Sequence, residues 1–253
     1  MNKNIISFKK KTLVILAHID DEFALSPIIK KITKINSDNI KILFCAERLN
    51  DSLRIRNKRR SESLSSLSLL GCKVSNIYYL NNYFLIDDLT LYKSFSDIYS
   101  YLKEFKKSFD FKQIFTLNFE GGHPDHDSLA LLIDKFSTNY SINKFFFPAY
   151  NNRKSFGIPL SLFRPLRSQE FFFSSIDFNF FCWKESILIA FIYKTEWKAF
   201  IKLLPFILYN YFFLHRVYFT NSIKLDSVIW SKSFSSRIYK VNYKKIQHFL
   251  YKI

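Results

Sequence analysis

The chain has 253 residues, of which 48% are hydrophobic and 19% aromatic. This length and composition exclude a disordered chain and suit one large domain, or a domain with a substantial extension. Lys and Arg outnumber Asp and Glu by 38 to 21, and the formal net charge of +17 favours an anionic partner or surface, although a biased genome would leave the same composition.

The N-terminus lacks the features of a secretion signal. The stretch MNKNIISFKKKT is charged, and the apolar run LVILA after it is only five residues long. Cys45, Cys72 and Cys182 are odd in number, far apart and without a CxxC pair, so they indicate neither a disulfide framework nor a cysteine zinc site. We therefore expect a cytoplasmic protein.

Five apolar runs predict strands that are buried in a sheet. They are residues 13–17, which show no alternation, and 40–46, 74–80, 112–119 and 144–150. Segments with helical spacing separate most of them, at 23–35, 52–70 and 91–107. Alternating strands and helices predict an α/β fold, a Rossmann-like, mostly parallel sheet flanked by helices.

The pattern loosens after Tyr150. Residues 151–182 are predicted to form loops and short strands, with Pro159 and Pro165 as breakers, and 184–214 to form helices interrupted at Pro205. We expect a C-terminal helical and loop cover, and hence a single domain of residues 1–253 with a core at 12–150 and an extension at 151–253.

One stretch of this extension resembles a membrane segment. Residues 200–219 read FIKLLPFILYNYFFLHRVYF, but Lys202, Pro205, Asn210 and His215 interrupt them, and the uncharged part is shorter than the roughly 20 apolar residues of a span. A buried helix pair, or a surface that lies on a membrane, is the better interpretation. From residue 144 onward there are 17 basic and 5 acidic residues, so most of the net positive charge, +12 of +17, lies in this part.

Two polar clusters follow the first and the fourth predicted strand. HIDDE occupies 18–22 and EGGHPDHD occupies 120–127, and both should lie at the carboxyl edge of the sheet, where α/β folds bind ligands. Carboxylates this crowded are costly to desolvate unless a cation compensates them. His18 and Asp21, with either His123 or His126, would supply three ligands to a catalytic metal. Nitrogen and oxygen ligands without a thiolate suit zinc and also admit iron, manganese or cobalt.

Each cluster also has a plain structural interpretation. Asp20, Asp21 and Glu22 could simply cap the helix that follows them, and an HxxH pair often occurs by chance. The occurrence of both clusters at strand ends favours the metal site.

Three motifs then resemble a known family. AHIDDE resembles the AHPDDE signature of the PIG-L/LmbE-like zinc deacetylases, GGHPDHD resembles their HPDH signature, and RRSESLSSLSLLG at 59–71 resembles their R-x-x-E helix. These enzymes remove acetyl groups from N-acetylglucosamine-containing substrates. The likeness covers residues 12–150 and is faint beyond them.

The resemblance implies a role for each motif residue. His18, Asp21 and His126 would be the zinc ligands and Asp20 the general base, while His123 would stabilise the oxyanion or protonate the leaving amine. Arg59 would meet the sugar or an anionic substituent, with Arg60 beside it as the other choice. Independently of the resemblance, Asp125 and Asp127 are expected to orient the histidines, as carboxylates commonly do for metal-bound imidazoles, unless one of them is a helix N-cap.

Two positions depart from the family pattern, and Arg59 has a second interpretation. Ile19 replaces the proline of the first signature, so the turn should be less rigid, and YKTEW at 193–197 stands where relatives tend to carry a Ser-Gln pair. Arg59 lies in a basic run and could pair with Glu62 across its helix.

The predicted function is therefore a zinc-dependent N-deacetylase acting on a GlcNAc-type amino sugar that is free, nucleotide-linked, lipid-linked or part of a glycan precursor. A catalytically silent sugar-binding protein that keeps the fold is the alternative. The net charge admits peripheral contact with an anionic membrane, whereas no motif supports specific nucleic-acid binding. The sequence specifies neither the pathway nor the oligomeric state.

Overall fold

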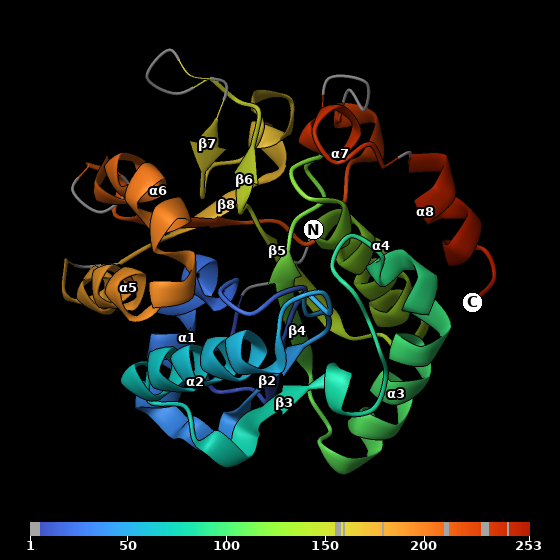
Figure 1. Cartoon of the computed structure of the whole chain (residues 1–253), viewed down its shortest axis with the longest axis horizontal. Helices are drawn as coiled ribbons and strands as arrows, with labels where there is room; N and C mark the ends of the chain where they lie inside the picture. The colour runs from blue at the N-terminus through green and yellow to red at the C-terminus, as the bar shows by residue number, and fades with distance from the viewer. Residues whose placement is uncertain are drawn as a thin grey trace.

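A computed structural model describes residues 6–154, 158, 160–178, 180–209, 213–228, 233–241 and 243–253. Its centre is a parallel sheet in the order β3-β2-β1-β4-β5 (Figure 1). The strands are β1 (Thr12–Leu16), β2 (Ile40–Phe44), β3 (Ile77–Tyr79), β4 (Gln113–Leu117) and β5 (Asn143–Phe147). The predicted Rossmann-like sheet is confirmed, and the five apolar runs coincide with its strands.

The sheet is buried on both faces because its strands carry apolar residues at successive positions. In β1, Val14 and Leu16 join one hydrophobic cluster, whereas Leu13 and Ile15 join the other, as the two-residue period of a strand requires. The first cluster includes residues of α1 (Glu22–Asn36) and α2 (Leu53–Leu69), and the second includes residues of α3 (Phe95–Ser108) and α4 (Pro124–Asn139).

Residues after 149 pack against the same core. Two short antiparallel pairs form, β6 (Tyr150–Asn151) with β7 (Ser161–Leu162) and β8 (Ser174–Asp177) with β9 (Arg216–Phe219). The remaining helices are α5 (Phe180–Ile192), α6 (Trp197–Tyr209), α7 (Phe234–Arg237) and α8 (Tyr243–Leu250). Phe146 and Thr220 exchange backbone hydrogen bonds of 2.8 and 2.9 Å, which attach the end of β9 to the edge of the sheet.

Two expectations for this part were wrong. Pro205 does not interrupt a helix but lies inside α6. A proline has no N–H to donate to the carbonyl of the residue four positions earlier, which here is Ile201. Both Pro205 and Ile201 are exposed to solvent. The break falls instead at the 3₁₀ turn Lys194–Glu196. The stretch 200–219 is not a helix pair either, because it ends in strand β9, whose apolar residues fill the core beside β5.

Pro159 and Asn210 lie outside the described residues, as does the side chain of Cys182, while Cys45 and Cys72 are free and buried. Among the helices described, none is both long and apolar enough to cross a bilayer.

Candidate metal centre and active site

The site lies where the strand order changes direction. In the sheet, β1 has β2 on one side and β4 on the other. The loops that follow β1 and β4 therefore border a crevice at the carboxyl edge of the sheet. The first loop carries residues 18–21 and the second leads into α4 through Gly121 and Gly122. A Cβ on Gly122 would stand 2.1 Å from the carbonyl oxygen of Tyr150, so this close approach of two loops requires glycine.

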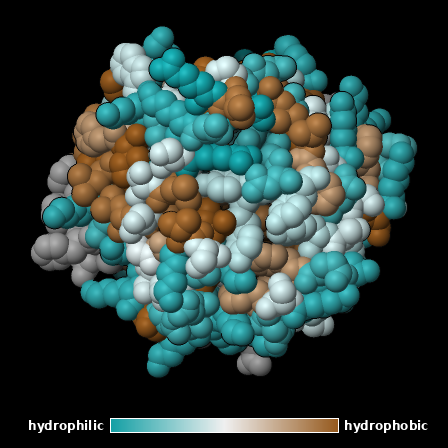
Figure 2. Space-filling view, turned by 60° about the horizontal axis from the view of Figure 1, so that its bottom comes forward, coloured by the Kyte–Doolittle hydropathy of each residue, from teal (hydrophilic) through white to brown (hydrophobic). Residues whose placement is uncertain are grey.

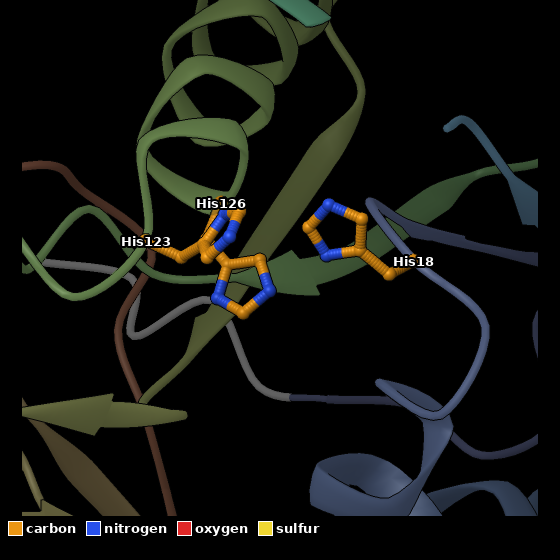
Figure 3. Close-up of side chains that lie close together, drawn as sticks. All are labelled: His18, His123 and His126. Carbon is orange, nitrogen blue, oxygen red and sulfur yellow. The ribbon is translucent and has the colours of Figure 1, made fainter. Parts of the chain in front are cut away.

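Three histidines from these loops gather at one point. His18 faces His123 and His126, which project from the start of α4 (Figure 3). One ring nitrogen of each lies within 4.8 Å of the others, and the ring centroids are 4.6 to 5.4 Å apart. The imidazoles of His18 and His126, the two predicted ligands, are therefore close enough to share one ion.

Asp21, the third predicted ligand, lies beside two of these histidines. Its Oδ1 lies 3.0 Å from His126 Nε2, and its Oδ2 lies 3.7 Å from His18 Nδ1 while accepting the backbone N–H of His18 at 2.8 Å. That hydrogen bond folds the turn so that both side chains face the same way.

His18 is held between carboxylates on opposite sides. Its Nδ1 faces Asp21, and its Nε2 lies 3.0 Å from Asp125 and 3.1 Å from Asp88. Metal-bound histidines commonly donate their second ring N–H to a carboxylate in this way. Burial alone would lower the pKa of His18, but the hydrogen bond to Asp125 and the neighbouring Asp88 and Asp21 outweigh it and raise that pKa well above its usual range.

Two buried polar atoms at this point form no hydrogen bond of good geometry, although each lies 3.0 or 3.1 Å from an ionisable neighbour. His126 Nε2 is close to Asp21 in a geometry that forms no hydrogen bond, and Asp88 Oδ1 is also without one among the described residues. Buried polar atoms are rarely left unsatisfied unless they have a ligand. Together with the imidazole and carboxylate donors, they fit a divalent cation.

Asp88 is a site residue that the sequence analysis missed. It lies 3.1 Å from His18 Nε2 and 3.6 Å from His123 Nε2, and it belongs with His18, His123 and Asp125 to a second group of four side chains that could hold a metal. Burial would raise the pKa of Asp88, but His18 and His123 prevail and lower it. The signal was the polar IDD at 86–88, a short loop beyond the end of β3 and therefore near the same edge.

His123 caps α4 and is fixed in one orientation. Its Nδ1 accepts the backbone N–H of Asp125 at 3.2 Å, so a neutral ring carries its proton on Nε2, on the side of the cluster. Burial lowers the pKa of His123 well below its usual range, and the positive neighbours His18 and His126 act in the same direction. The expected alternative, an N-cap at Asp125 or Asp127, was wrong because His123 holds that position.

Asp125 and Asp127 lie on the same helical turn but have different partners. Asp125 accepts hydrogen bonds from the backbones of Leu89 and Leu91 and lies 3.0 Å from His18 Nε2, a contact that its expected orienting role requires. Asp127 accepts from the backbones of Glu120 and Gly121 and from the Ser235 hydroxyl, and among the described residues it makes no hydrogen bond to a histidine. These contacts give the Asp127 carboxylate a role in shaping the glycine loop, and an orienting role toward a histidine stays a prediction.

Asp20 also lines the crevice. Its φ of 104° lies in the left-handed region that an aspartate adopts only under constraint, and its backbone N–H donates to Glu22 at 3.1 Å. Burial raises the pKa of Asp20 to about 7, against the opposing charge of Arg59. Ile19, which replaces the family's proline, is buried, and its carbonyl accepts a hydrogen bond from Arg59 at 3.1 Å.

Arg59, rather than Arg60, faces the crevice. Arg60 turns away to Glu47 and Asn82, at 2.6 and 2.9 Å. Arg59 pairs with Glu196, which also binds Arg48 at 2.8 Å. The suggested Arg59–Glu62 pair was wrong, because Glu62 accepts hydrogen bonds from the backbone and hydroxyl of Thr195. The segment YKTEW therefore closes over α2 through Thr195 and Glu196.

These groups border a cavity of about 320 Å³. Its walls combine the polar cluster with apolar side chains from both halves of the chain, a combination typical of small-molecule sites. The lining includes His18, Asp20, Asp21, Arg48, Arg59, Asp88, Leu117, His123, His126, Tyr150, Leu162, Glu196, Phe200 and Tyr239.

Comparison with known families gives one match. Residues 13–136 match the model of the PIG-L family, described as GlcNAc-PI de-N-acetylase. None of the curated proteins matches the chain.

Several solved structures share the fold. N,N'-diacetylchitobiose deacetylase from Pyrococcus horikoshii is 17% identical, with a TM-score of 0.50 over 80% of this chain and 78% of its own. The A40926 pseudoaglycone deacetylase Dbv21 is 12% identical, with a TM-score of 0.52 over 74% and 83%. A conserved protein from Thermus thermophilus is 14% identical, with a TM-score of 0.53 over 88% and 100%. At these identities the likeness concerns the fold alone.

Proposed function

Since residues 13–136 place this chain in the PIG-L family, we propose that the protein is a metal-dependent deacetylase that removes the acetyl group from an N-acetylated amino sugar. The observation that carries the proposal is the gathering of His18, His123 and His126 close enough to share one ion, with Asp21 beside His18 and His126, in the cavity that Asp20 also lines. We further propose a GlcNAc-type substrate, lipid- or nucleotide-linked, in glycoconjugate biosynthesis. The cytoplasm, with peripheral contact to an anionic membrane, is the proposed location.

In this proposal His18, Asp21 and His126 hold the metal. Zinc is the first choice for nitrogen and oxygen donors, and iron, manganese and cobalt fit them as well. When bound, the ion supplies a nucleophile at neutral pH and polarises the acetyl carbonyl. The Asp125 carboxylate keeps the His18 ring turned toward Asp21 by accepting from Nε2.

The chain's own side chains move the protons. Asp20, with a pKa of about 7, takes the proton of the attacking water. His123 is held with Nε2–H toward the cavity, where it donates to the carbonyl oxygen as charge develops or to the leaving nitrogen. The amide C–N bond breaks, and acetate and the free amino sugar leave. Leu117, Leu162 and Phe200 line the cavity and limit the access of water.

An acetate-release assay on purified protein tests the proposal. We expect about one metal ion per chain and release from at least one of UDP-GlcNAc, a simple GlcNAc glycoside and a lipid-linked GlcNAc. Asp20→Asn should keep the metal and lose activity by about 100-fold or more, the scale of general-base catalysis. Asp97→Asn, an exposed carboxylate on α3, is the matched control and should change neither.

The alternative is a catalytically silent sugar-binding protein. Two features favour it. Ile19 stands in place of the family's proline, and Arg59, the expected substrate-binding residue, forms an ion pair with Glu196. Protein that binds GlcNAc but holds no metal at neutral pH and releases no acetate would support this alternative. Full acetate release by Asp20→Asn would instead show that the base is wrongly assigned.

A further inference from the structure

The helices α5 and α6 expose large apolar side chains on one side of the molecule. Phe191 is 68% exposed, Trp197 53% and Ile201 58%. Figure 2 shows hydrophobic atoms gathered toward the left of the view, the side on which α5 and α6 lie in Figure 1. Exposed apolar side chains that lie together, rather than singly, usually mark a binding surface.

These side chains border a second cavity. It has a volume of about 350 Å³ and is lined almost entirely by apolar atoms, among them those of Phe191, Trp197, Ile201 and Leu204. Lys194 is the one lining residue with a charge. Such a groove lacks the convergent polar groups that would recognise a polar ligand, and so it suits a hydrocarbon chain.

A row of lysines runs beside the apolar row on α6. Trp197 and Ile201 are four residues apart and therefore lie on one stripe of the helix, and Lys198 and Lys202 form the adjacent stripe. Lys194 precedes them, and all three lysines are exposed and without an ion pair among the described residues. The nearby acidic residues are occupied elsewhere, Glu185 with Lys30 and Glu196 with Arg48 and Arg59. The face thus combines apolar and cationic groups, as in helices that lie in a membrane interface.

This face adjoins the candidate active site. Phe200 lines both cavities, and Leu203 lines the first while Leu204 lines the second. The polar crevice and the apolar groove are therefore neighbours across α6, with the side chain of Phe200 bordering both. A molecule with a sugar head and a hydrocarbon tail could reach both.

We propose that the α5–α6 face, defined by Phe191, Trp197, Ile201, Lys194, Lys198 and Lys202, is the surface that docks on an anionic lipid bilayer. The apolar row enters the acyl boundary, the lysines meet the anionic headgroups, and the groove receives the hydrocarbon chain of a lipid. This inference rests on the proposed deacetylase function only where it adds that the acetylated sugar is presented from that bilayer.

The charge of the molecule selects the bilayer over other occupants. Two copies of a chain with a net charge of +17 repel each other, and the face itself is basic, which disfavours self-association through it. Nucleic acid would use the lysines and leave the apolar row exposed to water.

Vesicle flotation tests the proposal without any acetylated sugar, so its outcome is independent of catalysis. Wild-type protein should float with phosphatidylcholine vesicles that contain phosphatidylglycerol, and much less with phosphatidylcholine alone. Trp197→Ser/Ile201→Ser and, separately, Lys198→Glu/Lys202→Glu should each weaken binding by at least about tenfold, because one removes buried apolar area and the other reverses the attraction to headgroups.

Matched controls lie elsewhere on the surface. Leu53→Ser/Leu85→Ser is the control for the apolar variant and replaces two side chains that are 64% and 82% exposed. Lys93→Glu/Lys103→Glu is the control for the lysine variant and makes the same change in net charge at exposed positions. Both control variants should bind vesicles as the wild type does. Wild-type circular dichroism and acetate release from a methyl GlcNAc glycoside would show that the face variants are folded. Equal binding by face and control variants, or no flotation of the wild type, would overturn the proposal. So would sedimentation showing a dimer that Trp197→Ser/Ile201→Ser dissociates, since the face would then be a contact between copies.

Discussion

At the scale of single residues, neighbouring carboxylates in α4 perform separate tasks. Asp125 and Asp127 are both fully buried and lie two positions apart, yet one contacts His18 and the other shapes a loop. Their side chains point to different sides of the helix start, so their identical chemistry leads to different consequences. Substitution of each should therefore affect a different measurable property.

We predict that Asp125→Asn lowers zinc affinity by about 10- to 100-fold, because His18 loses the carboxylate that orients its ring. Competition with a chromogenic chelator measures the affinity. Asp127→Asn is the matched variant, and it should lower the unfolding free energy with a smaller effect on affinity, since it removes the charge and one of the two acceptor oxygens that bind Glu120, Gly121 and Ser235. The reverse pattern, with only Asp127→Asn weakening zinc binding, would contradict the assignment.

Glu196 sets the charge that a substrate meets. It binds both Arg48 and Arg59, and Arg48 also lies 3.5 Å from Asp88, so these two carboxylates offset the charge of the cavity's arginines, while Asp20 and Asp21 add negative charge. Glu196→Gln should raise kcat/KM for a GlcNAc substrate with a phosphate next to the sugar by about fivefold relative to a neutral glycoside, since removing one nearby charge is worth about 1 kcal/mol at a partly exposed site. Acetate release from the two substrates gives the ratio.

Glu185→Gln is the control for that ratio. Glu185 pairs with Lys30 outside the cavity, so its loss should leave the preference unchanged. An unchanged ratio in Glu196→Gln would show that Glu196 has no part in substrate choice.

At the scale of elements, one buried carboxylate joins the loops that follow β4 and β5. Glu120 accepts the backbone N–H of Ala149 at 2.7 Å and the side chain of Asn151 at 2.9 Å. Burial raises the pKa of Glu120 to about 8 from an ordinary value of 4.5, and the hydrogen bonds only partly oppose it. Between these two pH values the folded protein holds a proton that the unfolded chain has lost.

The contribution of Glu120 to the free energy of unfolding must therefore fall as pH rises from 4.5 to about 8. The decrease is at most about 1.4 kcal/mol per pH unit. Glu120→Gln carries no such proton, so relative to wild type it should gain about 2 to 4 kcal/mol between pH 5 and pH 8. Urea denaturation at both pH values measures the difference. Glu104→Gln, at an exposed ion pair with Lys107, should show no such gain. A difference independent of pH would mean that Glu120 is ionised in the folded protein.

The parts of the fold that follow a local rule could be predicted from the sequence. Strands buried on both faces must be continuously apolar, so the run 13–17 predicted β1. Ligands bind at the carboxyl ends of the strands in such a sheet, so HIDDE and GGHPDHD indicated the position of the site. Contacts across the chain follow no such rule. Asp88 meets His18 from 70 positions away and Glu196 meets Arg59 from 137 positions away, and neither pair has a spacing that sequence could reveal.

At the scale of the whole molecule, the two halves of the chain share one core. Phe219 of β9 packs against Phe145 and Phe147 of β5, with ring centroids 5.7 and 6.3 Å apart, and residues of α5 and α6 belong to the same hydrophobic cluster as β1. A core that spans both halves couples their unfolding. This packing supports the proposal that residues 151–253 are a cover of one domain rather than a second domain.

We predict that Phe219→Ala lowers the unfolding free energy of the entire chain by about 3 to 5 kcal/mol, the usual cost of truncating a buried phenylalanine. Far-ultraviolet circular dichroism reports all helices, whereas tryptophan fluorescence reports the second half of the chain, because all three tryptophans lie after residue 150. Denaturation followed by these two probes should give one coincident transition in the wild type and in the variant. Phe171→Ala is the control, since Phe171 is 95% exposed and buries almost nothing. If residues 151–253 folded separately, Phe219→Ala would move the fluorescence transition alone and leave most of the dichroism signal at its original midpoint.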